Sequence, residues 1–197
     1  LFEEAENAAE ADLFEEYFYK DDLGVPSKVS VSAVKRLKES GSEVTAMPQY
    51  IPDESGLSAA ERGTLTHKAL QRSGLAKKTA EETRQFLKEL ISEGILDTTG
   101  EEALDAQSIA GVLNSALAQR ARDSSRMLLE APFCISLGAR ELGLAGSEES
   151  VILQGVIDMC FLEQGCWVIV DYKTDKVSGD CEAAAQKYMT QLSLYAK

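Results

Sequence analysis

Apolar residues fill most positions of two neighbouring stretches near the end of the chain, 151–162 and 166–172. Both stretches are rich in β-branched and aromatic residues, and the Glu-Gln-Gly segment between them suits a tight turn. The pattern therefore predicts a β-hairpin. If the turn is centred on the Gln-Gly pair, Asp158 of the first strand faces Asp171 of the second.

Facing carboxylates have an electrostatic consequence. Cross-strand partners have Cβ atoms about 5 Å apart, and like charges at that separation are destabilising unless something offsets them. A divalent cation would do so. Lys173 follows Asp171 by two residues and therefore shares its face of the strand. Asp158, Asp171 and Lys173 together predict the catalytic residues of a metal-dependent site that cleaves phosphodiesters, whereas a surface Asp-Lys ion pair would not explain why Asp158 is aimed at Asp171.

Apolar residues at helical spacing dominate most of the remaining chain. Capping boxes, in which a hydroxyl and a glutamate three residues later satisfy each other's backbone groups, mark two helix starts. The predicted helices begin near Ser30 or Ser32, at the capping boxes of Ser58 and Thr79, near Asp105, and at Cys181. The helix from Asp105 carries one apolar stripe as far as Leu117, and the helix from Cys181 runs to the last residue.

Residues 127–137 form an apolar, strand-like run that Pro132 interrupts, which suggests an edge strand or a bulge. Glu130 lies in this run, and an acid there is either at an exposed end or paired. Residues 41–57 and 138–150 are predicted loops. Helices alternating with β segments predict an α/β fold with a mixed central sheet flanked by helices.

Two further groups of polar residues lie on predicted helices. His67, the only histidine, lies on the helix that begins at Ser58, where position alone favours a hydrogen-bonded structural residue over a metal ligand. Tyr188, Gln191 and Tyr195 fall at positions i, i+3 and i+7 of the last helix and share one face. That face either packs on the sheet or, because it includes an amide, meets a ligand.

The composition is that of an ordinary soluble protein, with 44% hydrophobic and 27% charged residues among 197. No apolar run approaches the roughly 18 residues of a membrane span, so we expect no membrane association and a cytoplasmic location. The four cysteines have no C-x-x-C spacing and lie in predicted core segments, so we expect free thiols and no iron-sulfur cluster. Because the chain begins at a leucine, we expect it to be a fragment.

Charge is distributed unevenly along the chain. The net charge is −13, and residues 1–22 hold nine acids against a single lysine, a net of −8. Such a balance argues against a domain that captures nucleic acid unaided, but not against one to which a larger machine delivers DNA. Residues 1–25 are therefore predicted to be an acidic connector helix, and residues 26–197 to be the main domain.

Five short segments, in order, resemble the motifs of the RecB-type branch of the PD-(D/E)XK nucleases. The resemblance extends from about residue 28 to the end and is strongest to the C-terminal nuclease domain of AddA-type helicase-nuclease subunits. The segments are Gly63–His67, Glu130–Phe133, Gly155–Asp158, Asp171–Thr174 and Gln191–Tyr195.

This resemblance implies a restriction-endonuclease-like fold and a deoxyribonuclease that uses Mg²⁺, with Mn²⁺ able to substitute. It also implies that His67 is a metal ligand, although its position alone favours a structural residue. The implied metal ligands are His67, Asp158, Asp171 and the backbone carbonyl of Tyr172. Lys173 is the implied catalytic lysine, and the residues implied to complete the site or contact DNA are Gln191, Tyr195, Tyr188 and Glu130.

For the complete protein, the resemblance implies an upstream ATP-dependent DNA helicase, DNA as substrate, a second subunit of the AddB type, and a role in double-strand-break processing and recombinational repair. This chain has no Walker A motif, and its last helix stops where the family's helix continues. Two alternatives remain: a freestanding DNA exonuclease of the same superfamily, and a catalytically silent nuclease-like scaffold that holds a partner subunit.

Overall fold

The computed structural model describes most of the predicted main domain. The described residues are 25–40, 58–97, 104–144, 149–174 and 179–197. The predicted connector helix, apart from its final residue, and the predicted loop at 41–57 lie outside these residues. None of the described helices is both long enough and apolar enough to cross a membrane.

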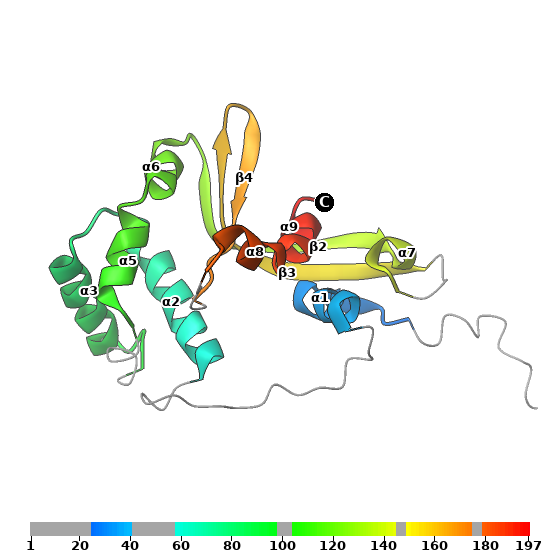
Figure 1. The fold of residues 1–197 in the computed structure, drawn as a ribbon, viewed down its shortest axis with the longest axis horizontal. Helices are drawn as coiled ribbons and strands as arrows, with labels where there is room; N and C mark the ends of the chain where they lie inside the picture. Colours follow the sequence, from blue (N-terminus) through cyan, green and yellow to red (C-terminus); the bar gives the residue numbers. More distant parts are fainter. Residues whose placement is uncertain (1–24, 41–57, 98–103, 145–148, 175–178) are drawn as a thin grey trace, which may run out of the picture.

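Strand β3, Ser150–Glu163, is the centre of a mixed sheet that has four strands among the described residues (Figure 1). Strand β2, Met127–Gly138, pairs with it antiparallel along almost its whole length. The first half of β3 also pairs parallel with β1, Lys28–Ser30. Its second half pairs antiparallel with β4, Cys166–Val170. Because β2 covers one edge of β3, β1 and β4 share the other edge.

A gap separates β1 from β4 on this shared edge. The pairing with β1 ends at Gln154, and the pairing with β4 starts at Met159. Residues 155–158 of β3 therefore have no strand beside them on this edge. Asp158 is the last residue of the gap, and the chain that leaves β4 after Val170 passes next to it. At this gap, the side chain of Asp158 accepts a hydrogen bond from the backbone of the segment that follows β4.

The predicted hairpin register is confirmed for the paired residues. Leu162 pairs with Trp167, and the ladder ends with Met159 opposite Val170, one position before Asp158 and Asp171. The turn residues Gln164 and Gly165 have φ values of 50° and 81°. Positive φ at both central residues is typical of the tight turn that matches the twist of a two-residue hairpin.

Four helices pack around the second half of β3. They are α2 (Ala59–Ser73), α3 (Ala80–Ser92), α5 (Ala106–Leu113) and α6 (Ala116–Asp123), which lie together at one end of the molecule (Figure 1). Their apolar faces form a core with Met159 and Phe161, which are at most 1% exposed. This core fixes α2 against the strand that carries Asp158.

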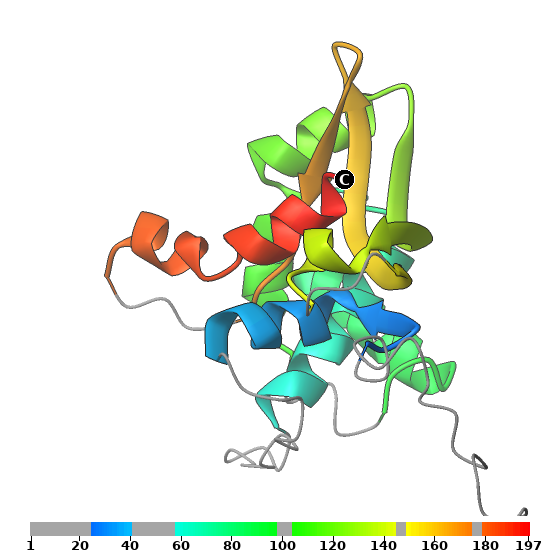
Figure 2. The same ribbon diagram turned by 90° about the vertical axis from the view of Figure 1, so that its right-hand side faces the viewer.

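A second core covers the first half of β3. It contains Val151 and Leu153 of β3 and residues of α1 (Val31–Ser40), α7 (Ala139–Leu142) and α9 (Met189–Tyr195). The short helix α8, Cys181–Gln186, precedes α9. Figure 2 shows α9 lying across the sheet, close to the hairpin. The two cores lie on either side of the gap and hold elements from both halves of the chain around it.

The two capping boxes are confirmed. Ser58 accepts from the Glu61 amide and Thr79 from the Glu82 amide, and each glutamate bonds back to its cap residue. The predicted stop of α2 is also confirmed, because Gly74 adopts the left-handed conformation with φ 55°. These local signals place α2, and with it His67.

Several other predictions were wrong. Strand β1 was missed, because three residues give no periodic signal. The helix from Asp105 is two helices, since Ser115 caps a new one by accepting from the Ala118 amide. The predicted loop at 138–150 contains α7, which Gly143 ends with φ 75°. The last helix is also interrupted, between α8 and α9.

The cysteine prediction holds only in part. All four cysteines are free, but only Cys160 is buried, whereas the others are exposed. Alternation explains the exposure of Cys134, because its neighbours Phe133 and Ile135 pack against the second core. Cys166 directly follows the hairpin turn, where the next residue, Trp167, is exposed as well. The predicted burial of all four thiols was therefore wrong.

Candidate active site

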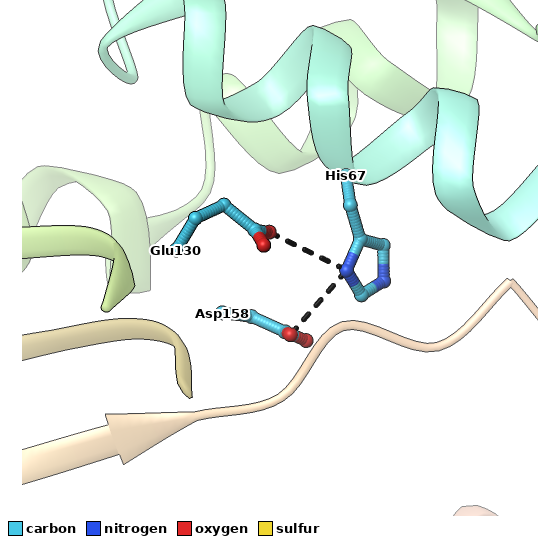
Figure 3. Close-up of side chains that lie close together, drawn as sticks. All are labelled: His67, Glu130 and Asp158. Carbon is cyan, nitrogen blue, oxygen red and sulfur yellow. Dashed lines mark ion pairs between the residues drawn. The ribbon is translucent and has the colours of Figure 1, made fainter. Parts of the chain in front are cut away.

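His67 lies on α2 and is directed at the sheet. Its Nδ1 atom is 3.3 Å from Asp158 Oδ1 and 3.5 Å from Glu130 Oε1 (Figure 3). Its Nε2 atom is 3.2 Å from the Tyr172 carbonyl oxygen. Both ring nitrogens thus face acceptors, and only the imidazolium form donates from both. The hydrogen bond to Asp158 accordingly raises the pKa of His67, with the charges of both acids adding to it and burial opposing it.

Glu130 reaches this histidine from a position in β2 where the backbone departs from regular strand conformation. Leu129 pairs with Met159 and Ala131 with Ile157, so Glu130 lies level with Asp158 but outside the ladder. Its φ of 49° is unusual for a residue with a side chain. The register of β2 against β3 is the same on both sides of Glu130, and Pro132 pairs with Val156, so the ladder contains no bulge. The alternative prediction for the run interrupted by Pro132 is confirmed, because β2 is an edge strand among the described residues.

Asp158 is 7% exposed and is fixed by backbone. Its Oδ2 atom accepts a 2.6 Å hydrogen bond from the Tyr172 amide, while Oδ1 faces His67. This contact joins β3 to the segment that follows β4, across the gap. We call His67, Glu130 and Asp158 the His67 group. One ligand atom from each of the three lies within 4.8 Å of the others.

Asp171 belongs to a neighbouring set of contacts. Its Oδ2 atom forms an ion pair with Lys173 Nζ, and its Oδ1 atom accepts a 2.8 Å hydrogen bond from Gln191 Nε2. Gln191 Nε2 also donates to the Tyr195 hydroxyl at 2.8 Å. We call these four residues the Lys173 group. The face of the last helix that was predicted to meet either the sheet or a ligand therefore contacts a site carboxylate.

The two groups are electrically coupled. Burial raises the pKa of Asp171, and the charge of Asp158 raises it further, although Lys173 and His67 lower it. Burial also raises the pKa of Glu130, followed by the charge of Asp158. Three carboxyl groups thus share a partly desolvated region, where like charges are costly unless cations offset them.

The structure brings every predicted site residue into one region, in two sets. The resemblance implied that Glu130 lies near the site, but its direct contact with His67 was not predicted. Tyr188 lies at the start of α9, and its ring centroid is 5.0 Å from Lys173 Nζ. Gly63, one turn before His67, is not crowded, since a Cβ there would lie an ordinary 3.6 Å from Thr174 Oγ1.

The donor set fits a hard divalent cation. Carboxylate and carbonyl oxygens are the ligands that suit Mg²⁺ and Mn²⁺, and the imidazole adds a nitrogen donor of the kind found in transition-metal sites. Two buried carboxylate oxygens, Glu130 Oε1 and Asp171 Oδ2, have no hydrogen bond among the described residues, although each has an ion-pair contact. Buried acceptors left in this way are suited to coordinating a cation.

Proteins with related sequences align with most of this chain. Each is named as one subunit of an ATP-dependent helicase/nuclease. The chain is 30% identical over 198 residues to the protein of Ruminiclostridium cellulolyticum, and 32% identical over 199 residues to that of Acetivibrio thermocellus. Each alignment covers 92% of this chain but 16% of the relative. The protein of the same name from Desulforudis audaxviator is 37% identical over 157 residues, covering 77% and 13%.

The family comparison extends across nearly all of the predicted main domain. A model described as the PD-(D/E)XK nuclease superfamily matches residues 29–197, which include all the residues of the His67 and Lys173 groups. The mixed sheet with flanking helices is the fold expected from the resemblance. The chain therefore belongs to the PD-(D/E)XK nuclease superfamily.

Proposed function

We propose that this chain is the nuclease domain from one subunit of a longer helicase-nuclease, where it hydrolyses phosphodiester bonds of DNA. The superfamily and the printed name of the relatives support this proposal, and the chain spans about 16% of the length of the first relatives it matches. One observation carries it: a cluster of metal-competent ligands, the His67 group, lies beside a lysine paired with a buried acid.

We assign Mg²⁺ as the metal ion, with Mn²⁺ able to substitute. His67, Asp158, Asp171 and the Tyr172 carbonyl are the proposed ligands, and Glu130 adds negative charge next to them. When bound, such a cation stabilises charge on the phosphate and activates water for attack. No iron-sulfur cluster is part of the proposal.

The remaining chemistry comes from the protein. Asp171 holds the Lys173 ammonium at the site, and Gln191 fixes the other carboxylate oxygen of Asp171. Lys173 is thereby placed to orient water and to donate to oxygen atoms of the phosphate, whose charge grows during displacement. The Tyr172 amide keeps Asp158 directed at His67. Each of the two acids is thus oriented before substrate binds.

For the complete protein, we propose ATP-driven DNA unwinding by parts that lie outside this chain. The relatives are each named as one subunit of an enzyme, so a second subunit of the AddB type is the proposed partner. The proposed role is double-strand-break processing in recombinational repair, in the cytoplasm. Delivery of DNA by a helicase would also explain how a chain with a net charge of −13 meets its substrate.

The decisive test replaces Asp171 with alanine. Asp171→Ala should abolish Mn²⁺-dependent cleavage of a labelled single-stranded oligonucleotide and leave the circular dichroism spectrum unchanged. Asp123→Ala, at an exposed aspartate that ends α6, is the matched control and should cleave like the wild type. A crystal soaked with Mn²⁺ should show anomalous density between His67, Asp158 and Asp171. Full activity of Asp171→Ala would rule out this site.

Two alternatives have distinct signatures. A freestanding exonuclease of the superfamily would be encoded without upstream helicase motifs, which the complete gene reveals. A silent scaffold would neither bind Mn²⁺ near Asp158 nor cleave DNA. The intact set of acids, histidine and lysine favours catalysis over the scaffold.

A further inference from the structure

A second lysine lies against the aromatic ring that contacts the catalytic lysine. Lys35 Nζ is 4.5 Å from the centroid of the Tyr188 ring, and Lys173 Nζ is 5.0 Å from the same centroid. Lys35 belongs to α1, far from the other site residues in sequence. The sequence offered no reason to include it in the site.

Packing fixes this arrangement. Val31 and Val34 of α1 are at most 2% exposed and belong to the core that also contains Leu194 of α9. Helices α1 and α9 pack against each other, and Tyr188 is the residue that caps α9. Lys35 directly follows Val34 and is half-buried, so its stem leaves the core at the start of α9. The position of its ammonium is therefore set by the fold.

Electrostatics explains what such a pair of ammonium groups attracts. Two ammonium groups around one ring repel each other, and their attraction to the negative π face of the ring offsets this repulsion only in part. Asp171 neutralises Lys173. Lys35 adds positive charge beside a site that, on the proposed function, holds the scissile phosphate. Lysine binds phosphate as a compact point charge, without demanding a fixed geometry.

We propose that Lys35, held by the Tyr188 ring, binds the phosphate adjacent to the scissile one on the same DNA strand. This inference rests on the proposed nuclease function and extends its site onto α1. Tyr188 acts as a positioning residue that links the binding lysine, Lys35, to the catalytic lysine, Lys173. The ligand class is a nucleic-acid phosphodiester, recognised without base specificity.

Lys35→Met tests the proposal, because methionine keeps an apolar stem and removes the charge. Binding of a fluorescein-labelled oligothymidylate is measured by anisotropy over a salt series, with Ca²⁺ to prevent cleavage. The variant should bind severalfold more weakly, and the slope of log K against log salt should fall by about 0.7, the value for one phosphate on a single strand. In cleavage assays with Mn²⁺, KM should rise more than kcat falls.

Matched variants separate charge from structure. Lys38→Met is the control, since Lys38 lies on the same helix but its side chain extends towards Gly143 at the end of α7. It should keep the wild-type affinity and slope. Lys35→Arg should restore binding. Tyr188→Leu should reproduce the binding defect, so that adding Lys35→Met changes little more.

The outcomes also separate this inference from the proposed function. If the wild type cleaves DNA and Lys35→Met has the affinity and salt slope of Lys38→Met, the inference is wrong and the nuclease assignment stands. If the wild type neither binds nor cleaves DNA, both are wrong. A parallel loss in Lys35→Met and Lys35→Arg would show that α1 packing, and not charge, is responsible, and would also overturn the inference.

Discussion

Asp158 and Asp171 come from the two arms of one hairpin, and both are largely buried, but their partners differ. Asp158 faces a histidine and lies level with a second acid, Glu130. Asp171 faces a lysine and an amide. The His67 group therefore has more negative than fixed positive charge, whereas in the Lys173 group the acid has a permanent cation.

This difference assigns separate tasks to two similar side chains. A group with surplus negative charge is stabilised by a divalent cation, and its geometry is useful only when that cation is present. A carboxylate already paired with lysine orients that lysine whether or not metal is bound. On the proposed function, the His67 group gathers the ion and Lys173 is the proton donor, while Asp171 both ligates the ion and holds Lys173. The charge of Asp158 is felt by Asp171 as well.

The largest effect in the comparison is expected for the Lys173 group. Lys173→Met removes the ammonium and keeps an apolar stem, so kcat for DNA cleavage should fall by about 10²- to 10³-fold, as for loss of a group that stabilises developing charge. The Mn²⁺ affinity, measured by calorimetry, should change little. A large loss of metal affinity would mean that the two groups do not have separate tasks.

The next effect is expected in the His67 group. Glu130→Gln keeps the shape of the side chain and removes its charge, so the Mn²⁺ dissociation constant should rise by about 10- to 100-fold, as for loss of a ligand's close partner. Gln191→Ala is the counterpart in the other group and should lower kcat while sparing Mn²⁺ binding. Equal Mn²⁺ affinity in wild type and Glu130→Gln would remove Glu130 from the ion-binding part.

A smaller effect should arise behind the Lys173 group. A Cβ at Gly155 would lie 2.8 Å from Phe133 Cε1, and Phe133 packs edge-on against Tyr195 at 5.7 Å between centroids. Because Tyr195 contacts Gln191, Gly155→Ala should push this series of side chains towards Asp171. We expect unfolding free energy to fall by about 1–3 kcal/mol, with kcat affected more than Mn²⁺ affinity.

Urea titrations of wild type and Gly155→Ala measure the free energy of unfolding, and Gly111→Ala supplies the control. A Cβ at Gly111 meets nothing within 4 Å, so that variant should not lose stability through crowding. If Gly155→Ala is as stable as the wild type, the contact between Gly155 and Phe133 is not a support of the site.

The smallest effect concerns a carboxylate remote from both groups. The Thr79 amide and hydroxyl lower the pKa of Glu82 in the folded chain, so ionised Glu82 adds stability above its unfolded pKa of about 4.5, and that stability is lost as pH falls through the lower folded value. The difference in unfolding free energy between wild type and Glu82→Gln should therefore shrink on acidification. A difference independent of pH would contradict this. Glu82→Gln should also leave cleavage unchanged, in contrast to the site acids.

Local signals were sufficient to predict that residues of the two groups lie close together. A two-residue turn fixes the register of its hairpin, so the proximity of Asp158, Asp171 and Lys173 could be inferred from the turn and the alternation of side chains along a strand. The capping box at Ser58 likewise placed His67 on a helix. The resemblance to a known family added Gln191 and Tyr195, which share a helical face.

Contacts between elements distant in sequence could not be predicted in the same way. The link from β2 to β3 contains a helix, so no turn fixes their register, and the position of Glu130 level with Asp158 depends on pairing along the whole of both strands. The positive φ of Glu130 could not be read from the sequence either. Strand β1 is too short for a pattern, and without α1 on the sheet Lys35 could not be connected to Tyr188.

The gap between β1 and β4 has a consequence for how the site can fail. Residues 155–158 pair with β2 on one edge but lack a neighbouring strand on the other, so order on that second edge depends on contacts such as the Tyr172 amide with Asp158. The two cores lie on either side and do not depend on these contacts. A variant that loses them should therefore keep its melting temperature while amide exchange accelerates at Tyr172, which makes the site a local unit of folding within a stable sheet.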